Sequence, residues 1–477
     1  MGKGTEMRAV NCRVLMLLAG LGVAGCAVGP DYERPALDLP DTWRVAPENA
    51  VTLANAAWWQ QFGDPVLDEL IAAALAENLD TRIAAARVAQ FAGALQATRA
   101  GFLPQFGYGL GADRARSSEL LLPGGADPYS TQYRAALSAS WQLDLFGRLR
   151  RESEAAQARV YASEQGRRGV LLTVTASVAA GYLALRALDR QLEIAQATAA
   201  NFERTLSLFE LRHREGVISR LEVAQVESQY QFATAAIPLL EGQIAAQENL
   251  LSVLMGRAPG PVARGLALAE LRLPEVPAAL PAALLEQRPD VLQAEQNLVA
   301  ANADIGAARA AYFPDISLTG ALGQASSVLG DLLDSAARSW SVGADISGPL
   351  FTGGAVAGRV AVAEGASEEA LLGYQAVVLN ALREVNDGLA GVAATGANTA
   401  TLARRVATLR EYAGLARMRF DAGAASYLDV LVADNELFAA ELAEVAARQA
   451  QYANLVGLYR AMGGGWAAGE GPAATAD

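Results

Sequence analysis

Along positions 424–462, ten residues fall at alternating steps of three and four, and eight of them are apolar or aromatic. The series comprises Leu428, Leu431, Asn435, Phe438, Leu442, Val445, Gln449, Tyr452, Val456 and Tyr459. A repeat of about 3.5 residues is typical of helices that wind around neighbouring helices. The surrounding stretch 354–462 contains no proline and is rich in alanine, leucine, glutamate and arginine. Most of it is therefore predicted to be helical.

One place in this stretch can reverse the chain. Gly423 can adopt the left-handed conformation that ends a helix, and Ser426 can cap the next helix. Asp429, three residues after Ser426, completes a capping box. The stretch is therefore predicted to form a helical hairpin, with arms of about 100 Å and about 60 Å at the usual helical rise.

The same landmarks occur earlier in the chain. Gly216, Ser219 and Glu222 precede their counterparts by 207 positions. Further matches at offsets of 205 to 210 are Gly256 with Gly463, Pro104 with Pro314, and Phe146 with Phe351. We therefore interpret the chain as a tandem duplication. Each copy has a long helical arm, at 147–215 in the first, and a shorter one, at 218–255. Pro238 is expected to kink or locally break the shorter arm unless neighbouring residues compensate.

Each copy also contains segments that alternate with a period of two, within 102–146 and 313–350. Apolar and polar residues take alternate positions in both copies, as in Leu137, Ala139 and Trp141 against Ser138, Ser140 and Gln142. This pattern predicts a pair of strands with one apolar face. Helices from Pro65 to about Arg99 and from Pro289 to Ala311 are expected to precede the two pairs.

The N-terminus has the pattern of an exported lipoprotein. Residues 1–25 combine basic residues with a short apolar run, which is typical of a signal peptide. Cys26 ends a lipobox-like sequence, so we expect it to be acylated; the alternative is ordinary cleavage beside an unmodified cysteine. Trp58 and Trp59 fit either a membrane belt or packing onto the next helix. The predicted division is a tether at 26–63, repeats at 64–256 and 288–463, a linker at 257–287 and a disordered tail at 464–477.

Composition excludes several classes of function. The formal net charge is −13, which argues against a nucleic-acid partner. The chain has one histidine, and its two cysteines both lie near the N-terminus, so neither a metal site nor an enzyme is predicted. The uncharged stretch from Gly169 to Leu185 is just long enough for a transmembrane helix, but its hydroxyl side chains weaken that interpretation.

Four strands with one apolar face cannot cross a membrane alone, because the open edges would leave backbone groups unpaired in lipid. Two chains would give a barrel filled by side chains, whereas three would give a barrel wide enough for a lumen. The short helices are predicted to stack end to end with the shorter arms and so match the long ones.

Several motifs together resemble the OprM and NodT branch of the TolC-type outer-membrane efflux proteins. They are Gly25-Cys26, Gly29-Pro30-Asp31-Tyr32, Trp58-Trp59, Arg288-Pro289-Asp290, Tyr312-Phe313-Pro314 and Ser426-Tyr427-Leu428-Asp429. The resemblance implies a homotrimer with a twelve-stranded transmembrane barrel and a twelve-helix periplasmic barrel. It implies a passive exit duct for small molecules, delivered by an inner-membrane pump, of RND type, through a periplasmic adaptor protein. It implies no cofactor beyond the acyl groups on Cys26, and contact with outer-membrane lipid.

The same resemblance assigns roles to the hairpin tips. Leu428, Asp429 and Val432 would form a periplasmic gate, in which three carboxylates attract cations and the apolar rings close the pore. Adaptor-facing positions would be Gly216, Val217, Ser219, Leu221, Glu222, Gly423, Ala424 and Ser426. A plain capping role for Asp429 is the alternative. At the level of the whole protein the alternative is a non-conducting coiled-coil lipoprotein, which would need no amphipathic strands.

Overall fold

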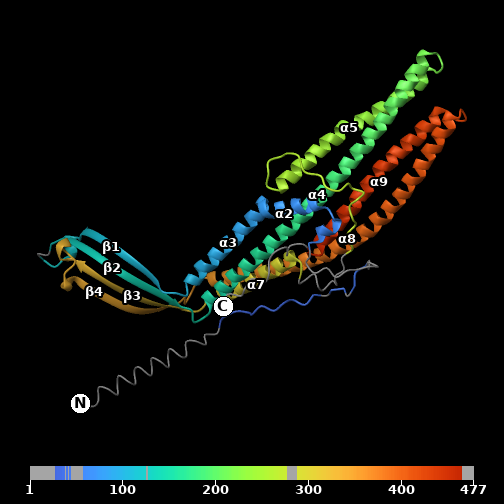
Figure 1. The fold of residues 1–477 in the computed structure, drawn as a ribbon. Coiled ribbons are helices and arrows are strands. Elements are labelled where there is room, and N and C mark those ends of the chain that lie inside the picture. Colours follow the sequence, from blue (N-terminus) through green and yellow to red (C-terminus); the bar gives the residue numbers. More distant parts are fainter. Residues whose placement is uncertain are drawn as a thin grey trace. The chain divides into compact units, whose positions relative to one another are not determined.

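The computed structural model describes residues 27–37, 39–40, 42–44, 57–124, 127–276 and 287–464. The order of elements is repeated along the chain (Figure 1). The first copy comprises α2 (Pro65–Glu77), α3 (Leu79–Ala100), β1 (Gln105–Arg116), β2 (Tyr129–Leu143), α4 (Arg148–Arg214) and α5 (Arg220–Leu254). The second comprises α7 (Pro289–Ala310), β3 (Asp315–Ser326), β4 (Arg338–Ser347), α8 (Ala355–Asp421) and α9 (Tyr427–Ala461).

The chain divides into two compact units. The first, 1–36, 88–163 and 294–374, contains all four strands and the adjoining parts of α3, α4, α7 and α8. The second, 37–87, 164–293 and 375–477, contains α2, α5, α9 and the remaining parts of the long helices. Both long helices, α4 and α8, have 67 residues, which gives each a length of about 100 Å.

The strands form one antiparallel sheet in the order β1-β2-β3-β4. Within β1 and β2, Phe106 lies opposite Ala139 and Tyr108 opposite Leu137. The next pairs along the same row are Leu137 with Leu322 and Leu322 with Trp340. Because β1 and β4 are the outer strands, each has one edge without a strand partner among the described residues.

The helical core of the second unit is centred on aromatic residues. Trp58 is 1% exposed and stacks on Tyr459 with ring centroids 4.9 Å apart. Phe62 packs edge-on against Tyr452. The tryptophans at 58 and 59 are therefore packed within the protein, and the membrane-belt alternative is wrong. The predicted 3.5-residue series on α9 is the packed face of that helix, since only Leu428 among its ten members is exposed.

A buried carboxylate joins three segments of this unit. Asp64 caps α2 by accepting the N–H of Val66 (2.9 Å). It also accepts the Tyr182 hydroxyl of α4 (2.7 Å) and the N–H of Leu266 (3.0 Å). Burial and the bond to Asp64 both raise the pKa of Tyr182, so its hydroxyl remains a donor. Multiple hydrogen bonds are what allow a carboxylate with no exposed surface to remain in the core.

The helix predicted from Pro65 to Arg99 is wrong in one respect, because it consists of two helices. Asn78 has an extended backbone (ψ 131°) that ends α2. Its side-chain oxygen accepts the N–H of Thr81 and thereby caps α3. Its amide nitrogen donates to the carbonyl of Leu254, the last residue of α5 (2.8 Å). A polar side chain that binds two backbone groups at once, one on α3 and one on α5, therefore marks the break in the helix here.

The equivalent junction in the second copy uses a different side chain. Arg288, which precedes α7, donates to the carbonyl of Ala461, the last residue of α9 (2.6 Å). Its guanidinium also binds Asp290 (2.7 Å) and Glu384 (2.9 Å). Each shorter arm therefore ends against the start of a short helix. The end-to-end stacking expected from the lengths is present at both junctions.

Pro238 does not break its helix. α5 runs continuously from Arg220 to Leu254 with this proline inside it. Ile237, the residue before it, packs against both neighbouring hydrophobic clusters. Packing on the helix flank compensates for the missing hydrogen bond.

Within the described residues, α4 is the helix that is long and apolar enough to cross a membrane, but 61% of its most apolar window is buried inside the protein. Val178, Tyr182 and Leu185 of that window belong to the aromatic core. This burial is the pattern of a core helix.

Gly256 offers a test of the stacked junction. Its φ of 69° is left-handed, and a β-carbon there would lie 2.3 Å from the carbonyl oxygen of Glu77. We expect Gly256→Ala to lower the free energy of unfolding by about 2 kcal/mol or more, since the clash is with backbone. Urea unfolding followed by circular dichroism measures the change.

The matched control is Gly242→Ala, within α5. No heavy atom lies within 4 Å of a β-carbon placed there, and its φ is not positive. Alanine should leave stability unchanged or raise it by up to about 1 kcal/mol. Equal behaviour of the two variants would contradict the close junction.

Candidate functional site

Both hairpins turn with the same backbone geometry. Gly216 follows α4 with a φ of 75°, and Gly423 follows α8 with a φ of 71°. The N–H of Val217 donates to the carbonyl of Arg212 (2.9 Å), and the N–H of Ala424 donates to that of Arg419 (2.8 Å). This six-residue closure around a left-handed glycine is a Schellman motif. Only a residue without a β-carbon adopts it without strain.

The capping boxes predicted after each glycine are formed. Glu222 accepts the N–H of Ser219 (2.7 Å) and its hydroxyl (3.0 Å). Asp429 accepts the N–H of Ser426 (3.0 Å) and its hydroxyl (3.3 Å) in the same way. The capping role of Asp429 is therefore real, and its role in a gate stays a prediction.

Aromatic residues join the two hairpins near their tips. The ring of Phe209 on α4 lies 4.4 Å from that of Tyr427 on α9, and Phe420 on α8 lies 5.1 Å from Tyr427. Val223 of α5 and Val430 of α9 complete the buried cluster. Burial raises the pKa of the Tyr427 hydroxyl. The two tips are thereby held to each other within one chain.

A polar contact accompanies this cluster. Arg417 of α8 donates to the side chain of Asn201 on α4 (3.3 Å) and forms an ion pair with Asp434 of α9 (3.2 Å). Burial raises the pKa of Asp434, and the charge of Arg417 opposes that rise. Sequence reasoning found neither this contact nor the aromatic cluster. Nothing in the helical period distinguishes these positions from other polar or apolar residues.

The proposed gate residues occupy the open side of α9. Leu428 is 54% exposed and Val432 is 42% exposed, and Asp429 is exposed beside them. Their neighbours Tyr427, Val430 and Leu431 are buried. At the first tip, Gly216, Val217, Ser219 and Leu221 are exposed, while Glu222 is half-buried. At the second tip, Gly423, Ala424 and Ser426 are exposed as well. Exposed large apolar side chains at both tips are available for contacts outside this chain.

The sheet has one face with mainly apolar side chains and one with mainly polar side chains. One carries Phe106, Tyr108, Leu110, Ala135, Leu137, Ala139, Trp141, Ile316, Leu318, Leu322, Trp340, Val342, Ala344 and Ile346. We call it the apolar face. The opposite, polar face carries mainly glycine, serine, threonine, aspartate and glutamine. Large residues of the apolar face are widely exposed, with Tyr108 at 83% and Trp340 at 75%.

The described part of the predicted tether that follows Cys26 packs against helices of the first unit. Arg34 binds both carboxylate oxygens of Glu295 on α7 (2.6 and 2.5 Å). Asp31 pairs with Arg151 of α4 (2.6 Å). Gly29 packs against Gly306 so closely that a β-carbon would lie 2.4 Å from its α-carbon. Cys26 itself and the signal peptide lie outside the described residues.

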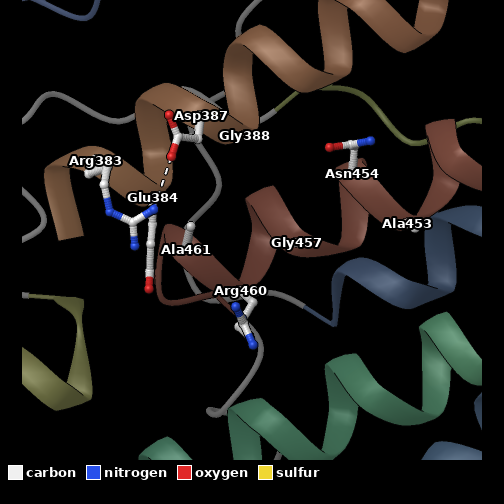
Figure 2. A pocket seen from close by; sticks show the side chains of 9 residues that line it. All are labelled: Arg383, Glu384, Asp387, Gly388, Ala453, Asn454, Gly457, Arg460 and Ala461. Atoms are coloured by element: carbon white, nitrogen blue, oxygen red, sulfur yellow. Dashed lines mark hydrogen bonds and ion pairs between the residues drawn. The ribbon is translucent and has the colours of Figure 1, made fainter. Parts of the chain in front are cut away.

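A cleft of about 340 Å³ lies between α8 and α9 (Figure 2). Arg383 and Asp387 form an ion pair in its wall (3.0 Å), and Glu384 binds Arg288. Of these charged groups, Glu384 contributes to the helix junction through its ion pair with Arg288. In the described part of the chain, no group of three or more histidine, cysteine, aspartate or glutamate residues could hold a metal ion.

Comparison with known proteins identifies this architecture. The profile of the outer membrane efflux protein family matches residues 70–257 and 280–464. The solvent efflux pump outer membrane protein SrpC of Pseudomonas putida is 35% identical over 460 residues, 95% of this chain and 98% of the relative. The cation efflux system protein CusC of Escherichia coli O6:H1 is 32% identical over 461 residues, 95% of this chain and 99% of the relative.

A solved structure agrees with these relatives. The open state of the Neisseria gonorrhoeae MtrE outer membrane channel superimposes with a TM-score of 0.85 at 30% identity, covering 92% of this chain and 99% of that one. The predicted fold class is confirmed: a mostly helical chain with a barrel-forming strand portion, in tandem repeat. The predicted outer-membrane location is confirmed as well. The chain belongs to the outer membrane efflux protein family, the TolC-type channels.

Proposed function

We propose that this chain is the outer-membrane exit duct of a tripartite efflux system. Small molecules would reach it from an inner-membrane pump, of RND type, through a periplasmic adaptor protein. The observation that carries the proposal is the register of the sheet, which collects the large apolar side chains on one face and glycine, serine and threonine on the other. Lipid on one side and water on the other require this separation.

Three copies would close the channel. The unpaired edges of β1 and β4 cannot remain open in lipid, so β4 of one copy would pair with β1 of the next. Four strands from each chain then give a barrel of twelve, and two hairpins from each chain give a periplasmic helical barrel. The spacer alternative does not explain the apolar face.

The tips would act as gate and docking surface. Leu428 and Val432 would form apolar rings from three copies, and Asp429 a ring of carboxylates. The exposed residues of the first tip, Val217 and Leu221, would contact the adaptor protein together with the backbone turns at Gly216 and Gly423. The aromatic cluster and Arg417 would keep both tips of a chain moving together.

The named relatives differ in what they export. SrpC is a solvent efflux protein and CusC a cation efflux protein, yet both align over nearly the whole chain. We therefore assign no cargo to this duct. Selectivity would reside mainly in the pump and adaptor.

The proposed acylation of Cys26 is consistent with the position of the residues that follow it, which pack against the protein from Ala27 onward. Ala27 lies against Gly147, where a β-carbon would come within 2.7 Å of its α-carbon. Val28 donates to the carbonyl of Phe146 (3.2 Å). These contacts fall between the end of β2 and the start of α4, so acyl chains on the preceding residue would enter the leaflet next to the helices.

Oligomeric state and conductance test the proposed duct. Light scattering of the purified mature protein should give a mass of three chains, and planar bilayers should show ion conductance. A monomer that does not conduct ions would contradict the duct and favour the spacer. A trimer that conducts no ions under any condition would support the proposed assembly but contradict the duct.

Asp429→Asn tests the carboxylate ring. We expect the cation-to-anion permeability ratio, measured from reversal potentials, to fall several-fold because three negative charges leave the constriction. Glu222→Gln is the matched control, since Glu222 makes the same capping bonds at the other hairpin. An equal change in both variants would assign the effect to helix capping.

Cys26→Ala tests the anchor. Mass spectrometry of the mature N-terminal peptide should find acyl groups in the parent protein and none in this variant. Cys12→Ala is the control and should keep the acylated peptide, because residue 12 lies within the predicted signal peptide. Acylation that persists without Cys26 would show that the anchor has been misplaced.

A further inference from the structure

The charged residues of the four strands divide unevenly between the two faces. Arg114, Arg116 and Arg338 occupy positions of the apolar face, in line with Tyr108 and Trp340. The polar face has Asp113, Arg134, Asp315 and Asp345. Within the four strands, therefore, every charge on the apolar face is an arginine, and every carboxylate is on the polar face.

These arginines lie at one end of the sheet. Arg116 is the last residue of β1 and Arg338 the first of β4, so both lie at the end of their strand that is away from α3 and α8. Apolar side chains such as Phe106 and Leu110 fill the face on the helix side of them. Because the helices are periplasmic, the arginine end faces the outer leaflet. A row of cations at the border of an apolar band is the position of lipid headgroups.

An aromatic ring accompanies two of the cations. The guanidinium of Arg114 lies 5.6 Å and that of Arg116 5.8 Å from the ring centroid of Tyr129. Such stacking orients a guanidinium over the aromatic ring. The nearby acidic residues Asp127, Asp331 and Asp334 lie in the loops beyond the strands. The carboxylate of Asp127 accepts the N–H of Tyr129 (2.9 Å).

Closure of the barrel would bring the three arginines together. β1 and β4 are the two edges of the sheet, and pairing between copies would be antiparallel. Arg338 of one copy would then lie at the same end of the seam as Arg114 and Arg116 of the next copy. This step rests on the proposed trimer.

We propose that this arginine cluster binds the phosphate groups of a phosphorylated glycolipid of the outer leaflet. Guanidinium groups match phosphate oxygens with two parallel hydrogen bonds, and the low dielectric at the membrane border strengthens them. The acyl chains of the same lipid would lie on Phe106 and Leu110, which continue the surface below the cations. A phosphate ion alone would lack that apolar contact.

The double variant Arg114→Gln/Arg338→Gln tests the site. Purified trimers are incubated with diphosphoryl lipid A in mixed micelles, and retained lipid is measured by native mass spectrometry. We expect retention to fall about tenfold or more. Arg134→Gln is the matched control, because Arg134 is an exposed strand arginine on the polar face, and it should retain lipid as the parent does.

Two further measurements make the result decisive. The unaltered protein should retain dephosphorylated lipid A far less than the diphosphoryl form, and this comparison needs no variant. Equal retention of the two lipids, displacement by millimolar inorganic phosphate, or an equal loss in Arg134→Gln would overturn the proposal. Ion conductance of the double variant should be unchanged, which separates failure of this site from failure of the duct.

Discussion

Backbone hydrogen bonding within lipid is the constraint on which this protein depends. An open strand edge has N–H and C=O groups that hydrocarbon cannot satisfy, at a cost of several kcal/mol for each group. The described sheet has two such edges, at β1 and β4. It also has a large exposed apolar face, whose contact with water would be unfavourable. The proposed trimer would pair both edges and place this face against lipid. The duplication of the chain supplies two strand pairs and two hairpins in a single polypeptide.

A second recurring problem is the end of a helix. The last carbonyls of α5 and α9 have no partner within their own helix, and both junctions are packed. The first copy solves this with the amide of Asn78 and the second with the guanidinium of Arg288, each donating to the final carbonyl of the arm. The two copies therefore share a hydrogen bond to the last carbonyl of the shorter arm, but a different residue donates it in each copy. The shared requirement is a donor at that place and not a particular side chain.

The candidate site combines local and distant determinants. The turns at Gly216 and Gly423 and their capping boxes follow from a few neighbouring residues, so sequence alone predicts them. The packing of Phe209 with Tyr427 and the pairing of Arg417 with Asp434 bring together residues from different helices. No local pattern encodes those contacts. The roles of Leu428, Asp429 and Val432 depend on further copies of the chain, and they stay predictions.

The sequence by itself determined the repeat, the hairpins, the alternating strands and the packed face of α9, because each of these follows from a short period or a local turn signal. Tertiary structure alone decided the break at Asn78, the continuity of α5 through Pro238 and the binding of Arg34 to Glu295. In each of these cases the deciding partner is distant in sequence: a carbonyl at the end of another helix, the packed flank of a neighbouring arm, or a carboxylate on α7. Local propensity determines which segments form helices and strands. Long-range hydrogen bonds and packing determine where those helices and strands end and which residues they contact.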